Sequence, residues 1–467
     1  MTDTATAMDL ITQRMRGIGA TPPAIDSFLR QYRQLVAGQS GFIESASIEP
    51  VTELPEADKL AAYADAGTAA LPKTLIVKLN GGLGTSMGLD RAKSLLPVKN
   101  GKTFLDVVVG QVLEIRLRTR TEMPLVLMDS FNTHDDTMAA LQKYPELAGG
   151  QKGIPVAFVQ DRVPKIRQDN LLPVDWIADS SREWCPPGHG NLYLAMATSG
   201  TLQALLRDGF EYAFVTNVDN LGATLSLPIL GFFAEQRLPF LMEVTDRTEA
   251  DKKGGHLARA RDGRLILRER AQCPPAEEKD FQDVRKYRFF NTNNLWVNLQ
   301  ALKRALDRHG NMLDLPLIVN RKNVDPSDPK STPVYQLETA MGAAIAMFSD
   351  AQAVRVPRSR FSPVKTAEDM LALWSDAYTL ADDMHLTLAP ERKGRPVVLH
   401  LDPKFFATYQ DLLARFPHGA PSLVNCESLT IHGDFRFGRN VVVRGNAVLK
   451  NDGPGQKTVA DGAVVGS

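Results

Sequence analysis

The feature that most constrains this chain is a short apolar run that leads directly into a cluster of glycines. Residues 75–94 have the sequence L-I-V-K-L-N-G-G-L-G-T-S-M-G-L-D-R-A-K-S. The first five predict a buried strand, because they are mostly apolar, partly β-branched and followed by turn formers. The glycines that follow lack a Cβ, so their backbone N–H groups can wrap a phosphate. Lys93 comes after a gap that lets its cation reach the same phosphates.

Three types of phosphate-binding loop compete for this segment. Gly82, Gly84 and Gly88 are spaced one residue too widely for the dinucleotide fingerprint. Asp106 nevertheless lies near the position expected of a ribose-binding acid. No Gly-Lys pair follows at the spacing of a P-loop. The third type is the nucleotidyltransferase loop, a glycine turn with a lysine several residues further on, and a connection that binds nothing is the remaining alternative.

Length and composition limit the possibilities. A chain of 467 residues predicts two or three domains. Its 54 lysines and arginines balance 54 aspartates and glutamates, which gives no electrostatic reason to expect binding to nucleic acid or to an anionic membrane. We expect neither a membrane-spanning segment nor a secretory leader. Three scattered cysteines suit a reducing, cytoplasmic setting and form neither a disulfide framework nor a metal-ligand pair.

The order of predicted elements indicates an α/β catalytic domain after a helical segment. Residues 1–70 are expected to be helical. From 71 to 375, β-rich runs alternate with helical segments such as 105–117 and 192–206. This alternation predicts a doubly wound sheet that binds its ligand at the carboxyl ends of the strands. The expected strands are 75–79, 125–128, 155–159, 212–216, 240–243, 295–297 and 353–356.

The end of the chain has a different pattern. Residues 376–420 are expected to form a linker. Residues 421–467 contain four successive six-residue units, L-T-I-H-G-D, F-R-F-G-R-N, V-V-V-R-G-N and A-V-L-K-N-D. A six-residue period with apolar starts is typical of a parallel β-helix. Four units give little more than one coil, so this tail should pack on a neighbouring part of the chain or on another subunit, as in a homo-oligomer.

Two polar stretches place single candidate residues where a ligand could reach them. His189 lies between two glycines in P-P-G-H-G-N, which lets a ligand approach its ring closely. A structural histidine is the competing interpretation. Asp219 follows the apolar run 213–215, and a carboxylate at the end of a buried strand is a natural Mg²⁺ ligand. A turn that caps the next helix explains the same carboxylate equally well.

Three further stretches could complete a site for a sugar and a triphosphate. The segment F-N-T-N-N-L-W at 290–296 contains asparagines whose amides both donate and accept, as sugar hydroxyls require, although such residues also favour turns. Glu243 could accept from a sugar hydroxyl or pair with an arginine. The segment R-S-R-F-S-P-V-K at 358–365 supplies positive charge besides Lys93, and a solvated basic loop is the alternative.

Together these stretches resemble the eukaryotic-type UDP-glucose pyrophosphorylases. The motifs come in the family's order from about residue 71 to residue 366, and the hexapeptide tail matches too. So many ordered motifs make a chance match improbable. They are the glycine loop with A-K-S, S-F-N-T-H-D-D-T, P-P-G-H-G-N, N-V-D-N-L-G-A-T, E-V-T-D-R-T, K-G-G, F-N-T-N-N-L-W, Q-L-E-T-A-M-G-A-A-I and R-S-R-F-S-P-V-K.

The resemblance implies a Rossmann-like nucleotidyltransferase core with a C-terminal left-handed β-helix. It implies Mg²⁺-dependent transfer of UMP from UTP to glucose 1-phosphate. Lys93 and Lys365 would face the phosphates as catalytic cations, and Asp219 would hold the metal. The residues implied at the nucleotide are Leu79, Asn80, Gly81, Gly82, Gln160, Gly188, Asn217 and Asp219, with Gln160 at the uracil edge. Those implied on the sugar side are His189 and Asn293 or Asn294.

The chain departs from the family pattern at three positions. Ala92 stands before Lys93 where proline is usual, and Val218 stands before Asp219 where serine is usual. Asn191 replaces the aspartate of Gly-His-Gly-Asp. None of these changes removes a proposed catalytic group. Asn191 would matter only if the replaced carboxylate served the metal.

Other functions remain as alternatives. A UDP-N-acetylhexosamine or broad-specificity UDP-sugar pyrophosphorylase is the nearest. The hexosamine enzymes typically carry G-G-Q-G-T-R-L-G, whereas this chain has Leu83 for Gln and Ser86-Met87 for Arg-Leu. A UDP-sugar-binding scaffold with a silent site is less favoured, because mere binding does not need Lys93, Asp219 and Lys365 together. The glycine spacing disfavours an NAD-dependent oxidoreductase.

Overall fold

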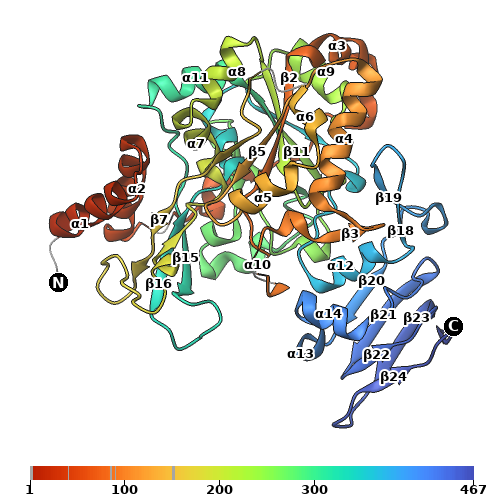
Figure 1. Cartoon of the computed structure of the whole chain (residues 1–467). Coiled ribbons are helices and arrows are strands. Elements are labelled where there is room, and N and C mark those ends of the chain that lie inside the picture. The colour runs from red at the N-terminus through yellow and green to blue at the C-terminus, as the bar shows by residue number, and fades with distance from the viewer. Residues whose placement is uncertain (1–3, 40, 85–86, 90, 150–152) are drawn as a thin grey trace.

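The centre of the molecule is a mixed ten-stranded sheet between helices, seen in the computed structural model of Figure 1. The structure describes residues 4–39, 41–84, 87–89, 91–149 and 153–467. The main path of the sheet is β1-β12-β14-β10-β2-β5-β6, to which β11, β13 and β17 are attached. The strands are β1 (Ile48–Pro50), β2 (Thr74–Asn80), β5 (Leu125–Asp129), β6 (Ala157–Val159), β10 (Tyr212–Asn217), β11 (Phe240–Asp246), β12 (His256–Ala260), β13 (Leu265–Arg268), β14 (Phe289–Asn298) and β17 (Gln352–Arg355).

Helices cover both faces of this sheet because its central strands are apolar on both sides. In β2, Ile76 packs into one core, while Leu75, Val77 and Leu79 pack into the other. The β10, β2, β5 and β6 strands run parallel, and β14 is antiparallel to β10. The predicted mixed α/β core is thereby confirmed. The helices of the first core are α3 (Ala64–Ala70), α4 (Phe104–Thr119), α9 (Leu227–Glu235) and α12 (Ala367–Trp374), and those of the second are α7 (Leu192–Thr198), α8 (Thr201–Arg207) and α11 (Leu299–Arg308).

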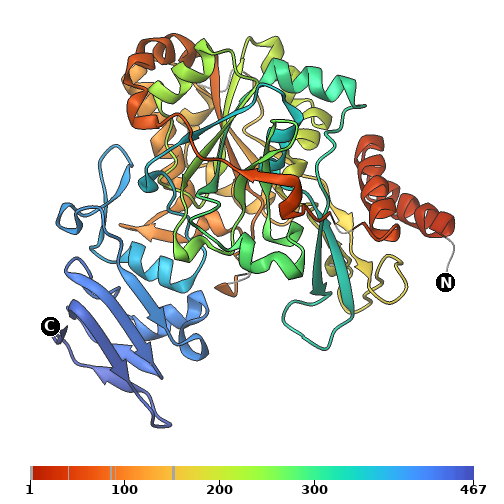
Figure 2. The same ribbon diagram turned by 180° about the vertical axis from the view of Figure 1, so that it is seen from behind.

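Two N-terminal helices form a layer of their own at one side of the molecule (Figures 1 and 2). They are α1 (Thr4–Gly17) and α2 (Pro22–Val36). Ile11, Phe28 and Tyr32 from these helices pack against Ile166 and Leu337. The small strands beneath them are β7 (Val163–Pro164), β8 (Ile166–Arg167), β9 (Trp184–Cys185), β15 (Ile318–Asn323) and β16 (Pro333–Glu338).

The C-terminal end forms a separate stack of parallel strands at the opposite side of the molecule (Figures 1 and 2). Leu429 pairs with Ala447, three six-residue units further along, so one coil takes three units. The stack begins earlier than the hexapeptides, since Val398 already pairs with Ser428. Its elements are β20 (Val398–Leu401), β21 (Cys426–His432), β22 (Phe435–Phe437), β23 (Val442–Lys450), β24 (Lys457–Val459) and β25 (Val464–Gly466), with α13 (Pro403–Phe406) and α14 (Tyr409–Arg415) beside them.

The remaining elements are short. Among the described residues, no helix combines the length and the apolar character that crossing a bilayer requires. The short elements are β3 (Pro97–Lys99), β4 (Lys102–Thr103), α5 (His134–Leu141), α6 (Pro145–Gly149), α10 (Glu278–Phe281), β18 (Tyr378–Leu380) and β19 (Leu386–Leu388).

Two local expectations and one alternative were wrong. The segment 192–206 is two helices rather than one, because Gly200 has a left-handed φ of 79° that no helix interior accommodates. The asparagine-rich segment at 290–294, for which a turn was the alternative, lies inside β14, since β11 pairs along it and β12 pairs with Phe290. The segment before residue 71 is not only helical, because it contributes β1 to the edge of the central sheet.

Candidate active site

The carboxyl ends of four parallel strands meet at one edge of the sheet, where the predicted site residues follow them. The pairing of β10 with β2 brings Asn217 opposite Leu79, and the pairing of β2 with β5 brings Asn80 opposite Asp129. Ligands of open α/β sheets bind outside these carboxyl ends. The register therefore gathers segments that are far apart in sequence into one candidate site.

The glycine turn leaves room for the amide of Gln160. A Cβ at Gly81 would stand 2.3 Å from Gln160 Nε2, so a side chain there would displace it. Gln160 is itself fixed, because its backbone N–H donates to the Asp129 carbonyl at 2.8 Å. Gly82 is exposed, and a Cβ there would meet nothing within 4 Å. Thr85 and Ser86 of the same motif lie outside the described residues.

Asn80 fixes the start of the glycine turn through side-chain hydrogen bonds. Its Nδ2 donates to Asp129 Oδ1 at 2.7 Å and lies 2.9 Å from Thr137 Oγ1. Its side chain is buried. Burial raises the pKa of Asp129, and hydrogen bonds from His134 and Asn80 oppose that rise. Asn80 thus ties the glycine turn to the motif S-F-N-T-H-D-D-T, which gives that motif a structural purpose.

Asp106, the acid that kept a dinucleotide site open, has a different role. Its carboxylate accepts from the Thr103 backbone N–H at 2.8 Å and thereby caps α4. It also accepts from Lys143 at 2.9 Å and from Tyr144 at 2.8 Å. With three donors around it, the carboxylate is not presented to a ribose.

Lys93 and Asp219 form an ion pair at the edge of the sheet where the parallel strands end. The distance between Lys93 Nζ and Asp219 Oδ2 is 2.6 Å, and each side chain is largely buried. Lys93 Nζ also donates to the carbonyl of Val364, the residue before Lys365. Three segments, the glycine loop, the end of β10 and the basic loop, therefore converge on one ammonium group.

The second oxygen of Asp219 is a candidate metal ligand. Asp219 Oδ1 is buried and has no hydrogen-bond partner within the described ranges. A cation would satisfy this oxygen, and one carboxylate completed by phosphate oxygens is a usual set of ligands for Mg²⁺. Elsewhere in the described part of the chain, no three His, Cys, Asp or Glu side chains are grouped as a metal cluster.

Lys365 lies close enough to His189 for its positive charge to oppose protonation of the imidazole. The Met341 backbone N–H donates to His189 Nδ1 at 3.0 Å, which leaves the ring proton on Nε2. Burial, together with the positive charge of Lys365, lowers the pKa of His189 to about 4. His189 is therefore a neutral donor at physiological pH and not a cation.

The loop that carries His189 packs tightly against the chain after β16. Gly188 has a φ of 81°, and a Cβ there would stand 2.5 Å from the Thr339 carbonyl oxygen. A Cβ at Gly190 would stand 2.4 Å from Thr339 Oγ1. Close packing therefore requires glycine on both sides of the histidine. The sequence had suggested only that these glycines let a ligand approach the ring.

Glu269 is a candidate site residue that sequence reasoning missed. Burial raises the pKa of its carboxyl group, and the nearby charge of Lys365 opposes the rise. A Cβ at Gly255 would stand 2.6 Å from that carboxyl group, so the K-G-G motif makes room for it. The signal was present in sequence, because Glu269 directly follows the apolar strand β13 as Asp219 follows β10.

Glu243 lies in a buried network with Arg360. Arg360 donates to both carboxylate oxygens at 2.9 and 2.7 Å. Trp296 Nε1 and Asn294 Nδ2 each donate to it at 3.0 Å. Each carboxylate oxygen thus accepts two hydrogen bonds, which matches the arginine-pairing alternative. Asn294 is fully buried in the same network and also accepts from Thr216 at 2.9 Å.

Asn293 is the asparagine that a bulge pushes out of this network. The register between β11 and β14 shifts between Glu243 and Val244, and Asn293 takes a left-handed φ of 58° there. Its Oδ1 accepts from Asn291 at 2.8 Å, and its side chain is only half-buried. Asn217, at the end of β10, is half-buried as well. These two amides, unlike Asn294, can reach a ligand.

The chain matches a known family over most of its length. A model of the family described as UTP–glucose-1-phosphate uridylyltransferase matches residues 25–444. The UTP–glucose-1-phosphate uridylyltransferase of Hordeum vulgare is 41% identical over 403 residues, which cover 86% of this chain and 82% of that protein.

Solved structures give the same result. The UDP-glucose phosphorylase from Trypanosoma brucei is 45% identical with a TM-score of 0.91, and the match covers 98% of each chain. A mutant UDP-glucose pyrophosphorylase from Leishmania major, in complex with UDP-glucose, is 43% identical with a TM-score of 0.91 over 98% of each chain. Since the match in sequence and in fold spans nearly the whole molecule, this chain belongs to the UTP–glucose-1-phosphate uridylyltransferase family.

Proposed function

We infer that this chain transfers UMP from UTP to glucose 1-phosphate and releases pyrophosphate, with UDP-glucose as the second product. One observation carries the inference. The glycine turn, Lys93, Asp219 and Lys365 converge at one edge of the sheet, in a chain whose family is known. A site of this kind suits the joining of two phosphorylated substrates, because such a reaction needs positive charge rather than a side-chain nucleophile.

The chemistry needs no covalent enzyme intermediate. A phosphate oxygen of glucose 1-phosphate attacks the α-phosphorus of UTP in line and forms a new P–O bond. The bond between the α-phosphorus and the bridging oxygen breaks, and its electron pair leaves with pyrophosphate. No proton has to move, so the protein's task is to hold two anions together and to stabilise the charge on the leaving group.

We assign the nucleotide to the glycine side of the site. Gln160 would read the uracil edge over Gly81, and the exposed Gly82 would lie against the phosphates. Lys93 and Lys365 would stabilise the leaving pyrophosphate from two segments. Leu79, Asn80, Gly188 and Asn217 would complete the nucleotide side, as the resemblance implies.

We assign the sugar phosphate to the side of His189. Its Nε2–H would donate to a phosphate oxygen, since Nδ1 already accepts from the Met341 backbone. Asn293 and Glu269 would take the glucose hydroxyls, because both are polar and half-buried, and the charge of Lys365 acts on Glu269. Glu243 and Asn294 would support this side from beneath through Arg360.

Asp219 would hold Mg²⁺ through its unpartnered Oδ1. The metal would add positive charge next to the phosphates. A cytoplasmic location, and an oligomer formed through the C-terminal coil, stay predictions.

The first experiment is to measure pyrophosphate release from UTP and Mg²⁺ with glucose 1-phosphate. N-acetylglucosamine 1-phosphate and galactose 1-phosphate are run in parallel. We expect rapid release with glucose 1-phosphate alone. Release with several sugars would point to the broad-specificity enzyme. No release from folded protein that binds UTP would contradict the inference and favour a silent UDP-sugar-binding site.

A further inference from the structure

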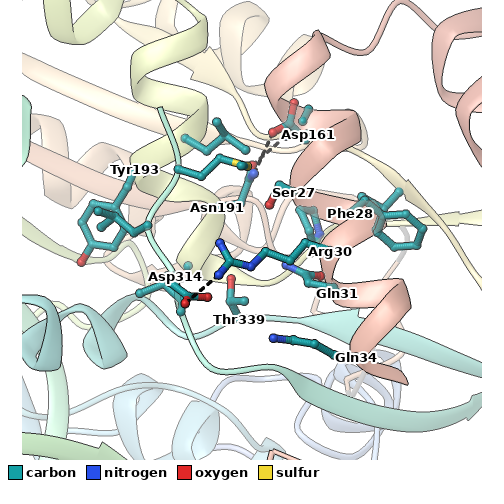
Figure 3. A pocket seen from close by; sticks show the side chains of 18 residues that line it. Ser27, Phe28, Arg30, Gln31, Gln34, Asp161, Asn191, Tyr193, Asp314 and Thr339 are labelled. Atoms are coloured by element: carbon teal, nitrogen blue, oxygen red, sulfur yellow. Dashed lines mark hydrogen bonds and ion pairs between the residues drawn. The ribbon is translucent and has the colours of Figure 1, made fainter. Parts of the chain in front are cut away.

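Two hydrogen bonds join the loop of Gln160 to the loop of His189. Asn191 Oδ1 accepts from the Asp161 backbone N–H at 2.8 Å, and Asn191 Nδ2 donates to Asp161 Oδ2 at 2.7 Å. Figure 3 shows the pair in the wall of the pocket between α2 and the core. A single amide thus binds both the backbone and the side chain of one residue.

This pair lies directly behind two residues assigned to the substrates. Asp161 follows Gln160, and Asn191 is two residues after His189. Asn191 is only 8% exposed, so water does not compete freely for its amide. Burial raises the pKa of Asp161, and the hydrogen bond from Asn191 opposes that rise.

The opposite side of the histidine loop is fixed by the chain after β16. The Gly190 N–H donates to the Thr339 carbonyl at 2.8 Å, and the Thr339 N–H donates to the Pro187 carbonyl at 3.0 Å. The histidine loop therefore has a backbone anchor on one side and the Asp161–Asn191 pair on the other. The pair connects it to the loop of Gln160, beyond the point where β7 pairs with β9.

We propose that Asp161 and Asn191 are positioning residues, which set the distance between the uracil-binding loop and the loop that carries His189. The proposal rests on the proposed function, because that function places Gln160 at the nucleotide and His189 at the sugar phosphate. Reaction between two bound substrates is sensitive to their spacing, and a misplacement of about 1 Å can cost about 100-fold in rate.

The side-chain hydrogen bond of this pair runs from the amide of Asn191 to the carboxylate of Asp161. This direction explains why position 191 is asparagine where the family motif has aspartate. An aspartate at position 191 could still accept from the Asp161 N–H. Its second oxygen would then face the Asp161 carboxylate, and two carboxylates at hydrogen-bond distance repel each other. Asn191 is therefore the residue that Asp161 requires. Exchange of the two side chains restores a donor opposite an acceptor.

The test uses three variants of the full chain and one control. The variants are Asn191→Asp, Asp161→Asn and the exchange Asp161→Asn/Asn191→Asp. The control is Asp314→Asn, which removes a carboxylate from the same pocket. Asp314 pairs with Arg30 at 2.8 Å and is exposed. Steady-state kcat and KM for both substrates, UTP affinity by calorimetry and thermal unfolding are measured for each.

We expect Asn191→Asp to lower kcat/KM by about 30-fold or more and to weaken UTP binding. The exchange should return both to within about threefold of wild type, and Asp161→Asn and Asp314→Asn should stay in that range. An exchange variant that regains thermal stability but not kcat/KM would overturn positioning in favour of a merely structural pair. An Asn191→Asp enzyme with normal kinetics would overturn it too.

Folding and the proposed function are kept separate by this design. If Asn191→Asp does not fold, the exchange still decides, because a folded exchange variant with wild-type kinetics can only come from the restored pair. If wild-type protein released no pyrophosphate, the proposed function would fail. The UTP affinities would still test the pair, with an unchanged affinity in Asn191→Asp contradicting it.

Discussion

The candidate site at the edge of the sheet buries charged side chains, whereas the interior of the C-terminal coil is apolar. At the site, the Lys93–Asp219 and Glu243–Arg360 pairs are almost entirely shielded from solvent. In the coil, the inward positions are apolar, as in Leu429, Ile431 and Val443. Buried ion pairs cost desolvation energy and seldom stabilise a fold on balance. The site therefore gives up stability for chemistry, whereas the coil only has to stack.

The two regions also differ in how far apart in sequence their contacting residues lie. The coil pairs residues that are one turn apart, such as Leu429 and Ala447. The site depends on pairs such as Lys93–Asp219 and Glu243–Arg360, which are separated by 126 and 117 residues. A local repeat can be recognised in a stretch of sequence, but a long-range ion pair cannot.

The largest effect should come from breaking the buried pair beneath the sugar side. Glu243→Ala leaves the Arg360 guanidinium without its carboxylate in a dry environment, and we expect a loss of about 3–5 kcal/mol in the free energy of unfolding. Urea denaturation measures it. Asp307→Ala, which removes the exposed partner of Lys303, is the matched control and should cost less than about 0.5 kcal/mol. Equal losses would end the contrast between buried and exposed charge.

The next effect concerns the two proposed catalytic lysines. Lys93→Ala and Lys365→Ala should each lower kcat by about 100-fold or more, by analogy with the loss of one preorganised donor. Steady-state kinetics with saturating UTP and glucose 1-phosphate measure the change. Lys404→Ala, beside the coil, serves as a control and should leave kcat unchanged. Near-wild-type turnover in either variant would remove that lysine from the mechanism.

Acid should destabilise the catalytic core through a buried histidine. Burial lowers the pKa of His256 to about 3, so the unfolded chain takes up a proton near pH 6.5 that the folded chain refuses. Its stabilisation is complete above pH 6.5 and is lost as the pH falls toward 3. At pH 5 the loss is about 2 kcal/mol. Unfolding at pH 5 and pH 7 measures it, and His256→Phe should flatten the difference; an unchanged slope would exclude His256 as its origin.

Removal of the candidate metal ligand should shift the metal requirement. Asp219→Asn is expected to raise the Mg²⁺ concentration needed for half-maximal activity by about tenfold or more. Because Asp219 also pairs with Lys93, the magnesium titration of Lys93→Ala is the control for loss of the ion pair alone. A magnesium titration identical to wild type in Asp219→Asn would rule out a metal role for this carboxylate.

The smallest effect should come from the coil. Ile431→Val removes one buried methyl group, and we expect a loss of about 1 kcal/mol in unfolding free energy with no change in kcat or KM. Thermal unfolding and kinetics measure the two separately. An altered kcat would show that the coil communicates with the site, which the contrast drawn above does not allow.

Cys185 is a buried cysteine just before the loop of His189. Burial raises the pKa of Cys185 to about 12, so its thiolate is scarce at neutral pH. Although Cys185 precedes the His189 loop, its burial favours an inert thiol.

The sequence by itself determined seven of the ten strands of the central sheet, the glycine turn and the coil. Each depends on local pattern: an apolar run, absent Cβ atoms and a six-residue period. It also identified the segments of Lys93, Asp219, His189 and Lys365 through their motifs. It could not decide whether Glu243 meets a sugar or an arginine. Its partner is 117 residues away in sequence.

Only the tertiary structure decided which polar groups touch each other. Strand register placed Asn294 in a buried network and a bulge turned Asn293 outward, although the two are neighbours in sequence. The Asp161–Asn191 pair likewise forms across two loops separated by 30 residues. Hydrogen bonds and ion pairs act over a few ångströms, so they depend on the folded path of the chain rather than on the order of its residues.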